Sequence, residues 1–461
     1  MQSRLRATRV AGARRAVAPA SRRLTVNVIN ANVLIANTKG GGHAFIGLYL
    51  AKELLRKGHQ VTIMNDGDEA KLTKKAPFSK YAELAHEGAT IAWGDPTNPS
   101  TYPRGNFDVV YDNNGKDLAS CQPLIDHFKH RDLSHYVFVS SAGAYSPHPL
   151  HPEHTETDTR KPSAGHTAVE AALAAARLPY TVFQPLYVYG PYGAKDCEQW
   201  FIDRIIRDRP VPLPSPGTQL TSLTHVADLA ALLAAVPGNR RAVGQSHNAC
   251  SDRCITFAGI CRAVGRALGK QADIVLYEPE QLGLGKGGKA EGFPFRTGHF
   301  FASCDKAKRD LGWRPQHSFL ADVEQRVEEY VAQGRASREV DFSIDDKILA
   351  ALGRSTAAAP TTAHSPASSP LSNSSSNSNG SSDASRFTRV SSPASSASSA
   401  SSVPRRPSHS PRRDLRIHRT PLPPNWREQL QGGEGGQGQQ QAAAAGAGRR
   451  SATPGDWRKG L

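Results

Sequence analysis

The sequence predicts an α/β fold: a doubly wound parallel sheet, a smaller C-terminal α/β subdomain and disordered tails. Three observations support this prediction. Short apolar runs of strand length alternate with helical stretches through residues 25–190. The first run leads through a Gly-rich turn into a helical pattern. Crossovers between parallel strands are right-handed, and they wind helices onto both faces of the sheet.

The first domain, residues 25–190, supplies most of the expected strands. The first strand, 31–38, runs through a turn at 39–47 into a helix at 48–59. Further apolar runs predict strands at 60–66, 89–95, 107–113, 135–141 and 179–185, and an Ala-rich stretch predicts a helix at 164–178. In such a sheet the ligand crevice lies at the carboxyl ends of the strands.

The second half, residues 191–353, mixes helices and strands and is assigned to the smaller substrate-type subdomain. Helical patterns are found at 197–208, 255–269, 306–315 and 323–335. Gly312 is expected near a helix C-cap because Pro315 follows it. Elements near 220–252, a strand and helix at 221–236 and a strand at 245–252, are expected to return to the first domain.

The formal net charge of +16 resides at the two ends of the chain. Residues 1–24 carry seven Arg and no acid, which predicts an organelle transit peptide. Residues 354–461 are rich in Ser, Pro, Ala, Gly and Gln, which predicts a disordered tail. Residues 25–353 sum to zero, so global charge gives no argument for nucleic-acid binding by the core. No apolar run reaches membrane-span length, and the six Cys are expected to be free thiols.

The Gly-rich turn aligns as Gly41-x-x-Ala44-x-x-Gly47, a pattern typical of Rossmann-like dinucleotide-binding domains. The middle position usually lacks a side chain, so that a pyrophosphate can approach the helix N-terminus. Ala44 weakens this interpretation, and glycines that only shape the turn are an equal alternative. Asn65 and Asp66 end the second strand, where a carboxylate would hold the ribose of NAD; for Asp66 a turn former is the alternative. NAD is therefore a candidate cofactor.

Several segments in order resemble the extended short-chain dehydrogenase/reductase superfamily of NAD-dependent sugar-nucleotide epimerases and dehydratases. They are residues 31–47, 94–95, 140–145, 223–230 and 310–315. The resemblance implies a catalytic Ser at Ser141, but Pro162 and His166 stand where the superfamily has Tyr and Lys. That Tyr works because a Lys ammonium and the nicotinamide ribose lower its pKa. Tyr145 is the one alternative acid from the neighbouring loop, and no Tyr of the chain has Lys four residues later.

A closer resemblance, to the a-type chloroplast stem-loop-binding proteins, covers roughly residues 25–352. It rests on residues 37–55, 112–118, 163–170, 195–209 and 343–350. The resemblance implies an RNA-binding protein of the chloroplast stroma with divalent-metal-dependent endoribonuclease activity on stem-loops of rRNA and mRNA. It also implies ribosomal or transcription particles as partners, and a homo-oligomer or a hetero-oligomer with a paralogue. Two alternatives stay open: an NAD-dependent epimerase or dehydratase, and a non-catalytic assembly factor.

Carboxylates that hold Mg²⁺ can activate water and neutralise a phosphate. The predicted catalytic residues are Asp95, Asp112, Asp117 and Lys116, and the predicted metal ligands are Asp66, Asp95 and Asp112. They follow the second, third and fourth strands, whose carboxyl ends meet at one edge of the sheet. For residues 112–117 the alternative is an Asx-type turn followed by a helix N-cap.

Basic side chains in two segments are expected to hold RNA phosphates. They are Lys71, Lys74 and Lys75 in the first segment, and Arg204, Arg207 and Arg209 on the helix at 197–208. A solvated helix face is the alternative for the arginines. Recognition would rely on shape or on unpaired loops.

Overall fold

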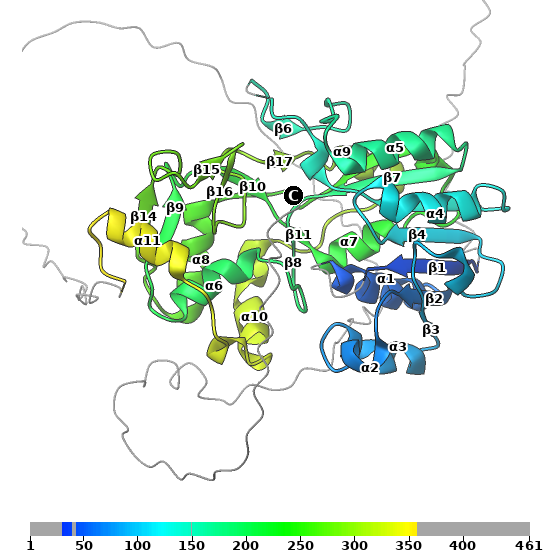
Figure 1. Cartoon of the computed structure of the whole chain (residues 1–461), viewed down its shortest axis with the longest axis horizontal. Coiled ribbons are helices and arrows are strands. Elements are labelled where there is room, and N and C mark those ends of the chain that lie inside the picture. The colour runs from blue at the N-terminus through cyan, green and yellow to red at the C-terminus, as the bar shows by residue number, and fades with distance from the viewer. Residues whose placement is uncertain (1–29, 39–42, 149, 357–461) are drawn as a thin grey trace, which may run out of the picture.

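The computed structural model describes residues 30–38, 43–148 and 150–356. A seven-stranded sheet of order β12-β7-β5-β4-β1-β2-β3 forms its centre, and every strand pair in it is parallel (Figure 1). The strands are β1 (Asn32–Asn37), β2 (Gln60–Asn65), β3 (Thr90–Trp93), β4 (Val109–Asn113), β5 (His135–Val139), β7 (Tyr180–Pro185) and β12 (Gln245–Ala249). The predicted doubly wound α/β class is confirmed. The predicted transit segment, Gly41 and the tail beyond residue 356 lie outside the described residues.

Strand β1 is buried on both faces because helices cover both sides of the sheet. Val33 and Ile35 belong to the apolar cluster that contains α1 (Ala44–Arg56) and α7 (Val226–Leu233). Leu34 and Ala36 point the other way, into the cluster with α4 (Leu118–Phe128) and α5 (Gly165–Ala175). This two-sided burial explains why the strand reads as a continuous apolar run rather than an alternating one.

Helix α1 begins at Ala44, four residues earlier than the sequence pattern indicated. Ala44, Phe45 and Ile46 are all buried, so these apolar side chains belong to the packed face of the helix and not to the turn. The N-terminus of α1 lies beside the carboxyl ends of β1 and β4, whose Asn37 and Asn113 donate to the carbonyls of Ala44 and His43.

The smaller lobe has its own apolar core. Helices α6 (Glu198–Ile205), α8 (Phe257–Leu268) and α10 (Phe319–Ala332) pack there with the parallel pair β9 (Val211–Pro214) and β14 (Ile274–Tyr277). The carboxyl ends of the central strands face this lobe (Figure 1). Any ligand at that edge of the sheet would therefore lie between the two lobes.

Shorter elements connect the two lobes and cover their edges. They are α2 (Glu69–Leu72), α3 (Tyr81–His86), β6 (Glu153–His154), β8 (Val188–Tyr189), β10 (Leu220–Ser222), β11 (Thr224–His225), β13 (Cys254–Thr256), β15 (Gly285–Lys286), β16 (Lys289–Ala290), β17 (Phe301–Ala302), α9 (Asp305–Leu311) and α11 (Ser343–Ala351). Gly312 caps α9 in the left-handed region at φ 65°, as predicted. The six cysteines are free thiols. Within the described ranges, none of the helices has the length and apolar character needed to cross a membrane.

Candidate functional site

Three asparagines end the central strands at matching positions. Asn37 on β1 pairs in register with Asn65 on β2 and with Asn113 on β4. The Asn113 side chain donates to Asn37 Oδ1 at 2.7 Å, and Asn37 Nδ2 donates to Asn65 Oδ1 at 3.1 Å. All three side chains are buried, so amide-to-amide bonds close this edge of the sheet where a dinucleotide would approach.

Gly47 leaves room for the Asn37 side chain of this network. A Cβ on Gly47 would lie 2.4 Å from Asn37 Cγ, a distance that no real side chain tolerates. Asn37 also donates to the carbonyl of Ala44 at 3.0 Å, which ties the end of β1 to the first turn of α1. The structure thus accounts for Gly47 by close packing, without a phosphate.

The predicted ribose contact at the end of β2 is engaged within the protein. Asn65 Oδ1 accepts from the Tyr81 hydroxyl at 2.8 Å and from Asn37. A ribose hydroxyl needs an acceptor at this position, and the oxygen of Asn65 already has two donors. Asp66, the next residue, is half-buried, and its role as the carboxylate that would hold a ribose stays a prediction.

The residues at the hydride-transfer position do not fit that chemistry. Ser141 Oγ accepts from the Gly143 amide at 3.0 Å, and Pro162 is exposed before α5. His166 lies in the first turn of α5, and burial lowers its pKa. The phenol of Tyr145 is completely buried and donates to Asn248 Oδ1 at 2.6 Å, and burial raises its pKa further. Among these residues, none combines a phenol of lowered pKa with a neighbouring ammonium, so they do not fit hydride transfer to NAD.

Asp112 is a structural carboxylate. It is completely buried at the end of β4, where it accepts from the Tyr136 hydroxyl at 2.7 Å and from the Asn114 amide at 3.1 Å. Burial raises its pKa to about 6, against the lowering effect of these bonds. A metal ion would have to displace those donors from inside the protein.

The other predicted carboxylates also close local turns. Asp117 caps α4 by accepting from the Ser120 amide at 3.0 Å and its hydroxyl at 2.9 Å. Asp95 accepts from the amide and the hydroxyl of Thr97 at 2.8 and 2.7 Å. The Asx turn and N-cap, which were the alternative for residues 112–117, are thus present; Lys116 between them is exposed.

The predicted Mg²⁺ set of Asp66, Asp95 and Asp112 is corrected by this geometry. Among the residues that the structure describes, no group of three His, Cys, Asp or Glu is arranged to hold a metal ion. The carboxyl ends of the strands do meet at one edge, but Asp95 accepts from its own loop, and Asp112 accepts from Tyr136 and from the Asn114 amide. The residues present therefore do not fit a divalent metal at this edge.

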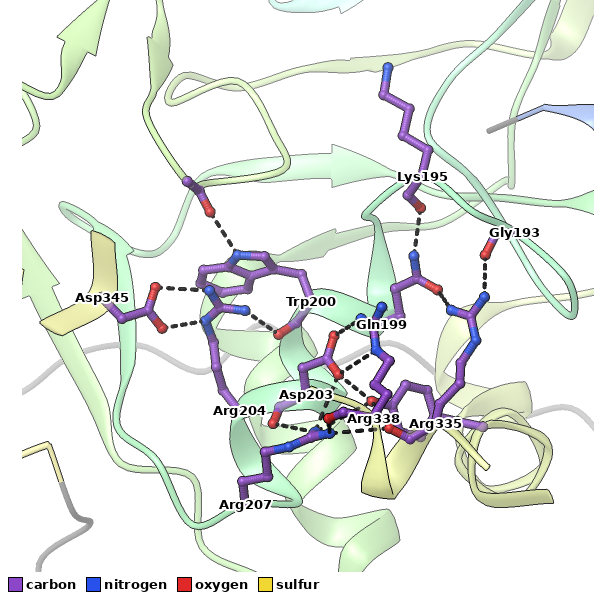
Figure 2. A network of polar contacts seen from close by, with 12 residues as sticks. Gly193, Lys195, Gln199, Trp200, Asp203, Arg204, Arg207, Arg335, Arg338 and Asp345 are labelled. Carbon is purple, nitrogen blue, oxygen red and sulfur yellow. Dashed lines mark hydrogen bonds and ion pairs between the residues drawn. The ribbon is translucent and has the colours of Figure 1, made fainter. Parts of the chain in front are cut away.

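The predicted basic face of α6 is also corrected, because its arginines bind inside the protein (Figure 2). Arg204 is only 4 % exposed and pairs with Asp345 of α11, with Nε 2.7 Å from the carboxylate. Its guanidinium lies 3.5 Å from the ring centroid of Trp200. Burial lowers the pKa of Arg204, and Asp345 opposes that effect.

The other two arginines are engaged as well. Arg207 donates to the backbone carbonyls of Arg338 at 2.8 Å and Asp203 at 3.0 Å, and Arg209 pairs with Asp346. The arginines thus tether α6 to the C-terminal segment of the smaller lobe and offer no basic face to RNA.

The lysines of residues 71–75 are placed differently. Lys71, Lys74 and Lys75 are all exposed around α2. Lys71 forms an ion pair of 3.1 Å with Asp68, in which both side chains face solvent. Pairs of this kind contribute little stability, so these lysines stay available as predicted RNA contacts.

The sequence did not single out a group of four basic residues that the fold brings together, Lys161, Lys195, Lys289 and Arg296. We call them the cationic site. They come from the loop before α5, the loop before α6, strand β16 and the segment before β17. No local motif could have shown this group, because its members lie in four separate segments of a core with no net charge.

Comparison with known proteins agrees with the α/β fold described above. Residues 40–249 match the NAD dependent epimerase/dehydratase family. A relative from Arabidopsis thaliana, the chloroplast stem-loop binding protein of 41 kDa b, is 34 % identical over 319 residues, which are 67 % of this chain and 82 % of the relative.

Solved structures share the fold at low identity. Pal from Bacillus thuringiensis superposes with a TM-score of 0.53 at 20 % identity, over 66 % of this chain and 99 % of that one. The dTDP-glucose 4,6-dehydratase of Bacillus anthracis, solved with NAD, gives 0.52 at 16 % identity, over 66 % and 98 % of the two chains.

The predicted relationship to stem-loop binding proteins is thus confirmed, on a relative that carries the letter b where the sequence motifs pointed to the a type. The chain belongs to the chloroplast stem-loop binding proteins, within the NAD dependent epimerase/dehydratase family.

Proposed function

We propose that this protein binds stem-loop RNA in the chloroplast, on an epimerase-type scaffold that no longer carries out hydride transfer. One observation carries the proposal: Pro162 and His166 stand where the enzymes of this fold need a phenol and an ammonium. Proline has no proton to give, and burial lowers the pKa of the His166 imidazole, which disfavours a positive charge where the enzymes have an ammonium. The relative with 34 % identity is named for stem-loop binding in the chloroplast, which supports RNA as the ligand that replaced a sugar nucleotide.

The carboxylates at this edge do not support metal-dependent cleavage. Asp112 and Asp117, the carboxylates that would serve it, hold the β4–α4 loop together through their bonds to Tyr136, Asn114 and Ser120. Endoribonuclease activity with Mg²⁺, as the sequence resemblance implies, would need carboxylates arranged otherwise.

Location and assembly follow from the same proposal. A protein that binds rRNA or mRNA stem-loops would be found in the stroma with ribosomal or transcription particles. An oligomer, either of this chain or with a paralogue, would place several RNA sites side by side and raise the overall affinity.

The test uses the full chain and a labelled RNA hairpin with an unpaired loop. Filter binding is measured over a series of KCl concentrations, once with Mg²⁺ and once with EDTA, and the RNA is then run on a denaturing gel. In parallel the protein is mixed with NAD and UDP-glucose, and turnover is followed by chromatography.

We expect salt-sensitive binding of the hairpin that is the same in Mg²⁺ and EDTA, intact RNA on the gel and no turnover of UDP-glucose. A protein that converts the nucleotide sugar, or that leaves the hairpin unbound at low salt, contradicts the proposal. RNA cut only in Mg²⁺ would support binding but overturn our exclusion of the metal.

A further inference from the structure

The three lysines of the cationic site lack an acid partner. Elsewhere in the protein, the half-buried Lys52 pairs with Glu83 and the half-buried Lys270 with Asp208. By contrast, Lys161, Lys195 and Lys289 make no ion pair with any residue in the described part of the chain. A lysine without an acid partner is ordinary on an open surface, but three beside one another are not.

Arg296 is held firmly, again without an acid. Its Nη2 donates to the Gly143 carbonyl at 2.9 Å, which joins the smaller lobe to the loop after β5. Its guanidinium lies 4.3 Å from the ring centroid of Phe300, and its backbone amide donates to the Tyr187 hydroxyl at 2.8 Å. Because most of its donors stay open, this fixed guanidinium can still bind an anion.

The four groups are close enough to repel one another. Lys195 and Lys289 are exposed at the surface; desolvation by the surrounding chain lowers the pKa of Lys195, and the charges of Lys289 and Lys116 lower it further. The pKa of Lys161 is lowered by burial and then by Arg296 and Lys289.

The backbone fixes two of these positions. Lys289 pairs with Arg296 in an isolated antiparallel bridge. Lys195 directs its ammonium away from the arginine network of α6 (Figure 2). The repulsion between these groups would be relieved by an anion between them.

The site lies where the chemistry of related enzymes has been lost. Lys161 directly precedes Pro162, and its amide donates to the Ala144 carbonyl at 2.7 Å. Lys289 lies on the β15–β16 hairpin. The turn of this hairpin contains Gly287 and Gly288, both at positive φ. Both lobes therefore contribute charges to one location beside the ends of the central strands.

We propose that Lys161, Lys195, Lys289 and Arg296 hold the phosphodiester backbone of RNA, an inference that rests on the proposed function. Lysines act on phosphates as point charges, and the arginine fork adds a directed contact. Contacts to phosphate position the RNA without reading its sequence, which suits recognition by shape and unpaired loops.

The test replaces Lys161, Lys195 and Lys289 by Gln in the full chain. The matched control replaces three exposed basic residues of α8 and α11 by Gln, namely Arg262, Arg266 and Lys347. Both variants lose the same charge and keep the basic ends of the chain. A third variant with Arg at the three lysine positions restores the charge.

The readout is the slope of log Kobs against log[KCl] for the labelled hairpin. Each phosphate contact in a single strand contributes about 0.7 to this slope, so the site variant should lose about 2 and the control nearly nothing. The Arg variant should recover most of the loss. Thermal melting should show the site variant at least as stable as the parent, because repulsion has been removed.

Two results distinguish a failure of the cationic site from a failure of RNA binding itself. If the parent binds the hairpin and the site variant keeps its full salt slope, the cationic site is wrong and RNA binding stands. If the parent binds no RNA, the proposed function itself fails. Loss of UDP-glucose binding in the site variant, measured by calorimetry while RNA binding is intact, would also overturn the assignment to RNA.

Discussion

Replacing Arg204 by Met distinguishes a structural arginine from an RNA contact. Arg204 is 4 % exposed and its partner Asp345 is 2 % exposed, so the substitution leaves a carboxylate buried without its cation. Removing one partner of such a pair destabilises a protein by about 3–5 kcal/mol. We therefore expect a loss of that size in the free energy of unfolding, with hairpin binding by the folded protein unchanged.

The assay is equilibrium unfolding in urea, followed by tryptophan fluorescence, on the full chain. Arg262→Met on the exposed face of α8 is the matched control and should change stability little. The double variant Arg204→Met with Asp345→Leu should recover most of the loss, because an apolar pair of similar volume fills the same space. A loss below about 1 kcal/mol, the range of an exposed ion pair, would refute the reasoning. So would weakened RNA binding at unchanged stability.

Three further substitutions test the reassigned residues. Asp112→Asn should flatten the pH dependence of stability. Because the pKa of Asp112 in the folded protein is about 6, above the ordinary 3.8, the folded state holds this proton more tightly than the unfolded state, and the parent loses stability as pH rises through 6. Urea unfolding should then show the parent losing about 1 kcal/mol more than the variant between pH 5 and 7, whereas parallel profiles would contradict the assignment. Asp117→Ala should cost about 1 kcal/mol of helix capping, equally with and without Mg²⁺ in thermal melts. Gly47→Ala should cost about 1–3 kcal/mol through overlap with Asn37, and Asn37→Ala in the same chain should return part of it if packing is the cause.

The sheet could be predicted because its signals are local. The centre of the run 31–38 is apolar, and Val33, Leu34 and Ile35 are all completely buried between two helix layers. The start of α1 was placed too late because glycines before Ala44 indicated a turn, whereas packing of Phe45 and Ile46 decided the helix. Local signals thus found the elements, and tertiary packing set one boundary.

The candidate site was harder to predict from the sequence because its contacts join residues that lie far apart along the chain. The spacing of Arg204 and Arg207 indicates a basic helix face, but nothing near them in sequence reveals Asp345 on α11. Asp112 and Asp117 are the right residue types for a metal, and only the positions of Tyr136 and Ser120 show that they are bonded elsewhere. The cationic site was hidden because acids elsewhere balance its charge in residues 25–353.

The residues at the hydride-transfer position, Pro162 and His166, contribute little to the stability of the fold. Pro162 is exposed, and His166 is only partly buried, so neither residue belongs to the apolar clusters that hold the sheet. The polar edge that a cofactor would otherwise satisfy is closed by Asn37, Asn65 and Asn113, which bond to one another. Because the core and this amide network hold the sheet together, substitutions at this edge should cost the fold little stability. This separation between core and edge would let such a scaffold bind RNA, as we propose, without loss of the fold.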